Sequence, residues 1–244
     1  MNKIRWGIIG PGSIAHNFAD GLTSSYSGQL VAIASKNNDR RKSFGDKYDI
    51  HEDFRFESYE DIVNSENIDA IYISTPHTFH AEWTIKAAGK GKHVLCEKPG
   101  AVNYEEGQQV IDAVNEAGVF YMEGFMYRCH PQIPKLIELI KNKIIGNIIS
   151  IESSFGFDMG KTIPEHRLFN KDLAGGGILD VGLYPISFSR LVAGAASNER
   201  FLDPEFFNVE AKIGETEVDE IAHANVKFKN GVEAKVSTAI RENM

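Results

Sequence analysis

The sequence predicts an α/β protein in which a doubly wound parallel sheet is followed by an α+β domain with a mainly antiparallel sheet. In the first half, short apolar runs alternate with amphipathic helical patterns, which is typical of βαβ units with helices on both sheet faces. After about Glu123, single apolar residues alternate with polar ones, as in strands with one covered face. We expect a first domain over residues 1–122 and a second over residues 123–244.

Composition narrows the classes of protein. Of 244 residues, 42% are hydrophobic and 25% charged, which suits a globular protein with a real core. The net charge of −8 argues against nucleic acid or an anionic membrane as the main partner. We expect no membrane span and no signal peptide, because a strand pattern begins at Ile4. Cys96 and Cys129 lack metal-ligand spacing, so we expect reduced thiols, no metal and a cytoplasmic location.

The elements of the first half follow from periodicity. Apolar runs predict strands over residues 4–9, 30–34, 70–74, 94–96 and 119–122. Helical patterns predict helices over residues 14–22, 40–48, 59–63, 79–88 and 104–117. Ile14, Phe18 and Leu22 recur every four residues and share one face. Asn103 and Glu106 resemble a capping box at the start of the last helix.

The second half mixes two helices with alternating strands. The helices are expected over residues 133–143 and 178–192, the latter entered through three glycines at 175–177. Alternation predicts strands over residues 149–157, 207–213, 222–228 and 232–236. Asn230-Gly231 between the last two strands is a strong signal for a tight hairpin.

A glycine loop suggests a ligand for the first domain. Residues 10–15 read Gly-Pro-Gly-Ser-Ile-Ala, a G-x-G-x-x-A motif between a predicted strand and a predicted helix. Gly10 allows the tight turn, and Gly12 allows the backbone to approach a pyrophosphate bound by the amides of Gly12, Ser13 and Ile14. This context predicts a dinucleotide-binding Rossmann domain. A plain glycine turn is the alternative.

The end of the second strand bears on the choice of dinucleotide. NAD-specific domains place a carboxylate there for the ribose 2′-hydroxyl. This chain has Ser35 and Lys36 instead, with Arg40 four residues later. A hydroxyl and two cations suit a 2′-phosphate, so we expect NADP, with NAD possible. Alternatively, these residues and the following Arg41 and Lys42 form a solvated basic helix start.

Five segments together resemble the Gfo/Idh/MocA oxidoreductase family over nearly the whole chain. They are the glycine loop at residues 10–15, Cys96-Glu97-Lys98-Pro99, the Ser74-Thr75-Pro76-His77 turn, residues 122–128 (MEGFMYR) and residues 175–185 (GGGILDVGLYP). They are similar to the branch that contains trans-dihydrodiol dehydrogenases, glucose–fructose oxidoreductase and xylose dehydrogenases. These motifs identify the family far more specifically than the substrate.

The chemistry centres on three residues. Lys98 follows a parallel strand at its carboxyl end, where ligands collect, and can hydrogen-bond a substrate oxygen and lower the pKa of a nearby proton donor. Asp180 and Tyr184 are four apart on a predicted helix and share one face. The resemblance implies that Tyr184 is the catalytic acid/base and that Asp180 orients the substrate hydroxyl or the catalytic group. Taken alone, Lys98 could be a solvated loop lysine and Tyr184 a cap on a core helix.

The resemblance also implies cofactor contacts away from the glycine loop. The residues concerned are Thr75, Pro76, His77, His80, Glu97, Lys98 and Arg167. Arg167 would reach the cofactor from the second domain. His77 and His80 lack an accompanying carboxylate or cysteine cluster, so we do not interpret them as metal ligands.

We therefore expect an NAD(P)-dependent dehydrogenase or reductase that transfers a hydride between nicotinamide and a carbon of a sugar, polyol or vicinal diol. Lys98 and Tyr184 would handle the proton at one substrate oxygen. The alternatives are a non-catalytic NAD(P)-binding regulator and an inactive cofactor-binding fragment. Family members normally continue beyond the position of Met244 with strands that commonly supply a dimer interface. The second domain is therefore expected to be incomplete relative to the family, and a homo-oligomer would form through its sheet.

Overall fold

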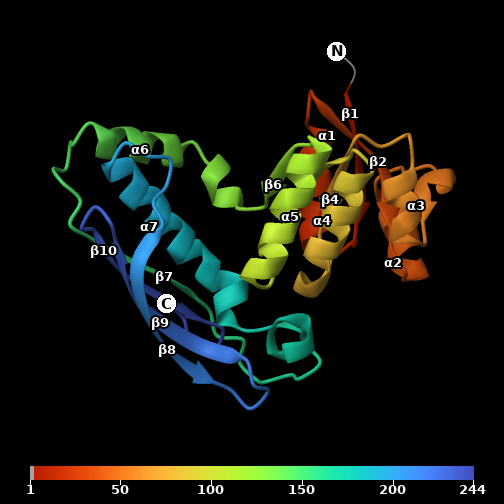
Figure 1. Ribbon diagram of the computed structural model, residues 1–244. Coiled ribbons are helices and arrows are strands. Elements are labelled where there is room, and N and C mark those ends of the chain that lie inside the picture. The colour runs from red at the N-terminus through yellow and green to blue at the C-terminus, as the bar shows by residue number, and fades with distance from the viewer. Residues whose placement is uncertain (1–2) are drawn as a thin grey trace. The chain divides into compact units, whose positions relative to one another are not determined.

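The computed structural model describes residues 3–244 and divides into two compact units. The first unit ends at Gly124 and the second is Phe125–Met244. The division falls two residues beyond the boundary drawn from the sequence. Figure 1 labels the elements of both units, which are described separately below.

The first unit contains the expected doubly wound parallel sheet. Within the described residues the sheet has six strands in the order β3-β2-β1-β4-β5-β6. The strands are β1 (Ile4–Ile9), β2 (Gly28–Ala34), β3 (Arg55–Phe56), β4 (Ala70–Ile73), β5 (His93–Cys96) and β6 (Tyr121–Glu123). All five pairings are parallel, which confirms the predicted fold class. Strand β3 was not predicted, because two residues are too short to show a period.

Helices cover both faces of this sheet. They are α1 (Ser13–Thr23), α2 (Asn38–Lys47), α3 (Tyr59–Asn64), α4 (His80–Gly89) and α5 (Tyr104–Ala117), with short 3₁₀ turns η1 (Glu52–Phe54) and η2 (His77–Phe79). Ile8 and Ile9 are both fully buried but belong to different core clusters, as alternation on a two-faced sheet requires. The predicted capping box is half right. Asn103 caps α5 by accepting from the Glu106 N–H at 2.8 Å, whereas the Glu106 carboxylate accepts from Val102.

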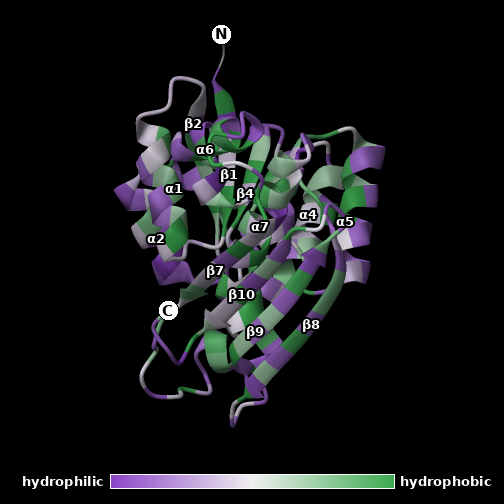
Figure 2. Ribbon diagram, turned by 90° about the vertical axis from the view of Figure 1, so that its left-hand side faces the viewer, coloured by the Kyte–Doolittle hydropathy of each residue, from purple (hydrophilic) through white to green (hydrophobic). Residues whose placement is uncertain are grey.

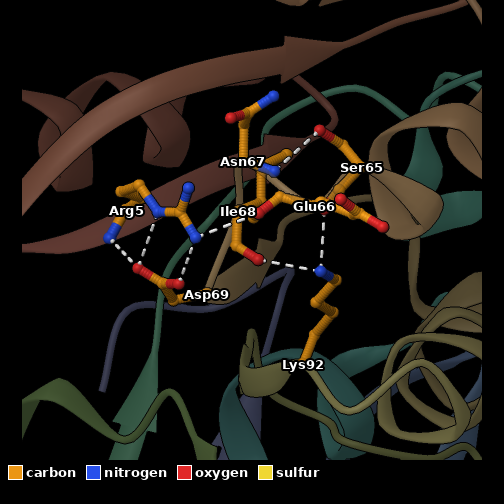
Figure 3. A network of polar contacts seen from close by, with 7 residues as sticks. All are labelled: Arg5, Ser65, Glu66, Asn67, Ile68, Asp69 and Lys92. Carbon is orange, nitrogen blue, oxygen red and sulfur yellow. Dashed lines mark hydrogen bonds and ion pairs between the residues drawn. The ribbon is translucent and has the colours of Figure 1, made fainter.

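A polar network fastens the amino ends of the central strands (Figure 3). Arg5 in β1 donates to both carboxylate oxygens of Asp69, at 2.7 and 3.1 Å, and its backbone N–H donates to the same carboxylate at 2.8 Å. These hydrogen bonds lower the pKa of Asp69 to about 2. Lys92 donates to the carbonyls of Ser65 and Ile68 at 2.7 and 2.8 Å. The network fixes strand ends opposite those expected to carry the site.

The second unit has a four-stranded, mainly antiparallel sheet in the order β7-β10-β9-β8, as predicted. The strands are β7 (Ser150–Gly156), β8 (Pro204–Ile213), β9 (Asp219–Phe228) and β10 (Glu233–Ala239). Only the β7–β10 pairing is parallel among the described residues. The helical elements are η3 (Met126–Cys129), α6 (Gln132–Lys141), η4 (Arg167–Phe169), η5 (Lys171–Leu173), η6 (Ile178–Gly182) and α7 (Leu183–Ala196).

One face of this sheet packs against α6 and α7. The core joins Val192 of α7 to Val226 of β9 and Val236 of β10, and alternating polar and apolar bands run along β8 to β10 in Figure 2. The expectation of a covered face is wrong for the edge strand β8. There Phe207 and Ile213 are 65% and 58% exposed, because these helices do not extend over it.

The hairpin between β9 and β10 is longer than the two-residue turn predicted from Asn230-Gly231. Gly231 adopts a φ of +83°, as the motif requires, but the loop spans residues 229–232. The Asn230 side chain is drawn toward α7, where its amide donates to the Ala193 carbonyl at 2.9 Å. This bond anchors the loop to the helix, and within the loop the Gly231 N–H donates to the Phe228 carbonyl while the Phe228 N–H donates to that of Val232, both at 2.9 Å.

One stretch, Lys171–Ala196, has the length and composition of a candidate membrane span, although none was predicted. In this structure 56% of its most apolar 18-residue stretch is buried. Leu191 and Val192 are among the buried residues. The helical conformation is interrupted at Ala174, whose φ is +54°. Burial of this kind is what the core helix of a folded domain shows.

Candidate active site

The glycine loop joins β1 to α1 with its open side at Gly12. Gly10 has a φ of +90°, and a Cβ there would lie 3.0 Å from the Ser74 carbonyl oxygen, so glycine is required. A Cβ on Gly12 would meet only that oxygen, at 4.0 Å. The Gly12 N–H donates to the Gly10 carbonyl at 2.8 Å, whereas we expected it to donate to a pyrophosphate. Ser13 and Ile14 are left to supply amides.

The start of α1 has the character of an anion site. No side chain among residues 3–244 caps this helix, and its first turn contains no acidic residue. The first N–H groups of a helix lack intrahelical acceptors and carry partial positive charge. A pyrophosphate therefore fits here on both geometric and electrostatic grounds.

The turn after β2 combines a buried hydroxyl with exposed cations. Ser35 is 4% exposed, and its Oγ accepts from the Asn37 N–H at 3.2 Å. Lys36 and Arg40 are exposed. Arg41 donates to the Ser35 carbonyl at 2.5 Å, so it braces this turn instead of lying free in solvent.

The turn after β4 is tied to the Lys98-Pro99 segment through a buried histidine. His80 is 1% exposed, with Nδ1 2.7 Å from the Pro99 carbonyl oxygen and Nε2 2.8 Å from that of Thr75. Burial lowers the pKa of His80. The ring therefore lies behind the turn and joins two loops. His77 is also buried, with its ring centroid 5.9 Å from that of His80.

Within the described residues, one polar atom of this turn lacks a hydrogen-bond partner. It is the buried Thr75 Oγ1. Buried polar atoms normally have partners, so an unpaired hydroxyl beside the glycine loop suits a polar ligand.

Lys98 lies just past β5 on a segment held by two carboxylates. The Tyr72 hydroxyl donates to Glu97 Oε1 at 2.6 Å, and the Gly100 N–H donates to Glu123 Oε1 at 2.7 Å. Lys98 itself is half-buried and precedes a cis peptide bond to proline. Glu123 was not a predicted site residue. Its only sequence signal was its place inside the family-like segment 122–128.

In the second unit the helix carrying Asp180 and Tyr184 begins irregularly. Residues Ile178–Gly182 form a π-turn that leads directly into α7. Pro185 has no N–H to donate to the Val181 carbonyl, so a regular α-helical bond cannot form there. Such π-turns inside helices are frequent at functional sites.

Asp180 is paired with a cation. It is 4% exposed, and its Oδ1 lies 2.9 Å from Nη1 of Arg167. The structure thus brings together two predicted site residues that were given separate tasks. Arg167 was expected to contact the cofactor, and the contact observed here is with Asp180.

Tyr184 lies in an aromatic cluster. Its ring centroid is 5.4 Å from that of Phe155, 5.8 Å from Phe125 and 6.2 Å from Tyr127. A cavity of about 380 Å³ beside it is lined by Met126, Tyr127, Ser153, Ser154, Phe155, Tyr184, Pro185 and Phe188. These described lining residues include no charged side chain. This cavity was not predicted from the sequence, because its lining residues come from three separate segments.

Known proteins resemble this chain over both units. The family model described as "Oxidoreductase family, NAD-binding Rossmann fold" matches residues 4–125, and the "GFO/IDH/MocA C-terminal domain" matches residues 133–243. Trans-1,2-dihydrobenzene-1,2-diol dehydrogenase of Mus musculus is 32% identical over 99% of this chain and 70% of its own length. D-xylose 1-dehydrogenase (NADP(+)) 2 of Haloferax volcanii is 35% identical over 78% of this chain and 57% of its own length.

Solved structures show the same architecture. A 3-ketoreductase from Actinomadura kijaniata in complex with NADP and TDP-benzene has a TM-score of 0.86 and 30% identity, with 99% of this chain and 71% of that one covered. The aldose-aldose oxidoreductase from Caulobacter crescentus, complexed with glycerol, has a TM-score of 0.88 and 27% identity over 99% and 72%. With both units matched, this chain belongs to the Gfo/Idh/MocA family of NAD(P)-binding oxidoreductases.

Proposed function

We propose that this chain is an NADP-dependent dehydrogenase or reductase acting on a CH–OH carbon of a neutral sugar, polyol or vicinal diol. The observation that carries the proposal is Tyr184 at the edge of an uncharged, largely aromatic cavity. Aromatic faces pack against the C–H face of a sugar ring or against a cyclic diol, and serine hydroxyls hydrogen-bond its hydroxyl groups. The relatives named as a diol dehydrogenase, a xylose dehydrogenase and a 3-ketoreductase support a CH–OH or ketone carbon as the reacting group.

The residues present fit the dinucleotide. The amides of Ser13 and Ile14 would hold the pyrophosphate, with Gly12 leaving room for it. Lys36 and Arg40 would pair with a 2′-phosphate, and Ser35 shapes the turn that presents them. The rest of the cofactor would be contacted by the unpartnered Thr75 hydroxyl and by Pro76, His77, Glu97 and Lys98. When bound, the nicotinamide supplies or accepts the hydride.

The chain's own residues manage the proton. The Tyr184 hydroxyl would deliver a proton to the substrate oxygen in reduction and remove it in oxidation. Lys98 would hydrogen-bond a substrate oxygen, and its positive charge would lower the pKa of a nearby proton donor. Asp180 would orient the substrate hydroxyl or the catalytic group, and Arg167 would compensate its buried charge. His80 would act indirectly, by joining the Thr75 and Pro99 turns.

We also propose that the chain forms homo-oligomers through its second sheet. The support is β8, an edge strand with exposed Phe207, Val209 and Ile213. Long apolar edge strands readily pair with another chain. Multi-angle light scattering of the wild type and of Val209→Lys tests the idea: the variant is expected to be more monomeric. A monomeric wild type would rule the interface out.

The central experiment is a spectrophotometric screen of sugars, polyols and cyclic diols with NAD and NADP. Turnover with NADP on a neutral substrate, lost in Tyr184→Phe, would support the proposal. Tight dinucleotide binding without turnover on any substrate would favour a non-catalytic regulator instead. Turnover confined to phosphorylated or carboxylated substrates would contradict the uncharged cavity as the substrate site.

A further inference from the structure

The helix that carries Asp180 and Tyr184 begins on a carboxylate from a distant part of the chain. Asp219, the first residue of β9, accepts from the Ile178 N–H at 2.6 Å and also from the Gly177 N–H. Gly177, the residue at the cap position, has no side chain to offer. Asp219 therefore does the work of an N-cap from 41 residues away.

The glycines that precede the helix are shaped around this carboxylate. A Cβ on Gly176 would lie 2.2 Å from Asp219 Oδ1, and Gly176 has a φ of +110°. A Cβ on Gly177 would lie 3.3 Å from Oδ2. The buried Thr238 of β10 adds a hydrogen bond to the Gly177 carbonyl at 3.3 Å. Gly176 is therefore required for the carboxylate to reach the helix start, and Gly177 leaves it room.

The charge of the Asp219 carboxylate suits its place at the start of the helix. The amino end of a helix carries partial positive charge, which favours an ionised carboxylate. Burial raises the pKa of Asp219, and the hydrogen bonds from Ile178 and Gly177 act in the opposite direction. The Asp219 carboxylate is therefore partly buried and hydrogen-bonded to the start of the helix.

We propose that Asp219 is a positioning residue for the reaction, because it fixes the helix start from which Asp180 and Tyr184 project. The inference rests on the proposed function of Tyr184. Asp180 lies two residues after Ile178, and its own N–H donates to the Gly176 carbonyl at 3.3 Å, so a shift at the cap moves it directly. Tyr184 follows one helical turn later.

The test compares Asp219→Ala and Asp219→Asn with Glu217→Ala, an exposed neighbour whose carboxylate pairs only with Lys171 among the described residues. Asp219→Ala is expected to lower kcat by about 10- to 100-fold, since small misplacements of catalytic groups cost that much, with little change in KM or NADP affinity. Asp219→Asn keeps an acceptor oxygen and should restore most of kcat. Glu217→Ala should match the wild type.

Hydrogen exchange separates this inference from the proposed function. Asp219→Ala should speed exchange at the Gly177 and Ile178 amides whether or not a substrate has been found. A wild type without turnover contradicts the proposed function, and the exchange result then decides whether Asp219 holds the helix start. Unchanged kcat in Asp219→Ala, or Asn performing no better than Ala, would overturn the positioning role.

A second variant keeps the test decisive if Asp219→Ala fails to fold. Gly177 has an ordinary helical φ of −72°, so alanine fits its backbone conformation. The Gly177→Ala substitution places a methyl group about 3.3 Å from Asp219 Oδ2. It should lower kcat several-fold while the protein remains folded. Wild-type kcat in that variant would contradict the proposal.

Discussion

Arg167 Nη1 lies 2.9 Å from Oδ1 of the buried Asp180, so the carboxylate expected to orient the chemistry has a cationic partner within its own unit. A buried carboxylate without such a partner would favour its protonated form. Removing Arg167 would take this cation away from a buried carboxylate, which costs more stability than the loss of a surface ion pair.

Tyr184→Phe should cut turnover by about 100- to 10,000-fold, the usual contribution of a general acid or base. Dinucleotide affinity should hardly change, because the hydroxyl serves the substrate. Steady-state kinetics and calorimetric titration with NADP measure the two effects. Tyr127→Phe is the matched control, since it removes a hydroxyl from the same aromatic cluster, one bonded to Ser187 at 2.8 Å. Equal losses in the two variants would remove Tyr184 from the acid/base role.

Gly12→Val should abolish dinucleotide binding without unfolding the protein. The open space around Gly12 accepts a side chain, which then occupies the approach expected for the pyrophosphate. Calorimetry with NADP and a thermal unfolding curve test the two halves of this statement. Gly21→Val, in open space on α1, is the control. A folded Gly12→Val protein with wild-type affinity would refute the cofactor assignment.

Lys36→Asp should shift preference from NADP toward NAD, because a carboxylate there repels a 2′-phosphate and accepts from a 2′-hydroxyl. NADP affinity of the wild type should also fall between about 50 mM and about 500 mM salt as the charge pair is screened. Lys42→Asp, an equal change of charge on the following helix α2, should alter preference much less. A wild type that binds NAD as tightly as NADP would contradict this reading.

The Arg5–Asp69 pair should make stability depend on pH at the acid end. The pKa of Asp69 is about 2 in the folded protein and about 3.9 in an unfolded chain. The unfolded chain therefore binds the proton first, and stabilisation that is complete above about pH 4 is lost as the pH falls toward 2. Urea unfolding of Asp69→Asn should show a weaker dependence across that window. The exposed Asp61→Asn should behave like the wild type.

The sequence predicted what depends on local pattern. The parallel sheet, the long helix α5 and the glycine loop all have strong periodic or motif signals. Strand β3 and the π-turn at Ile178 have none, because one is too short and the other depends on where Pro185 falls in the helix. The exposed face of β8 was wrongly expected to be covered, since alternation shows that a strand has an apolar face but not what packs on it.

In the candidate site, the residues were predicted from the sequence but the contacts that hold them were not. Lys98, Asp180 and Tyr184 stood out because they lie in family-like segments. The contacts that hold them were not predictable, because Arg167, Glu123 and Asp219 reach their partners across 13, 23 and 41 residues. The bond from the Gly12 N–H to the Gly10 carbonyl was not predicted either, because a glycine motif does not specify the hydrogen bonds within its own loop. Long-range pairing has no period for a sequence pattern to reveal.

The distance in sequence between Ile178 and Asp219 has a consequence for how the chain matures on the ribosome. Synthesis proceeds at about 5 to 20 residues per second, so the helix start emerges several seconds before its carboxylate in the slower case. Until β9 is made, the three glycines leave that end of the helix free to fray. We therefore expect the start of the helix that bears Asp180 and Tyr184 to become ordered late in synthesis, once β9 has been made and Asp219 can cap it.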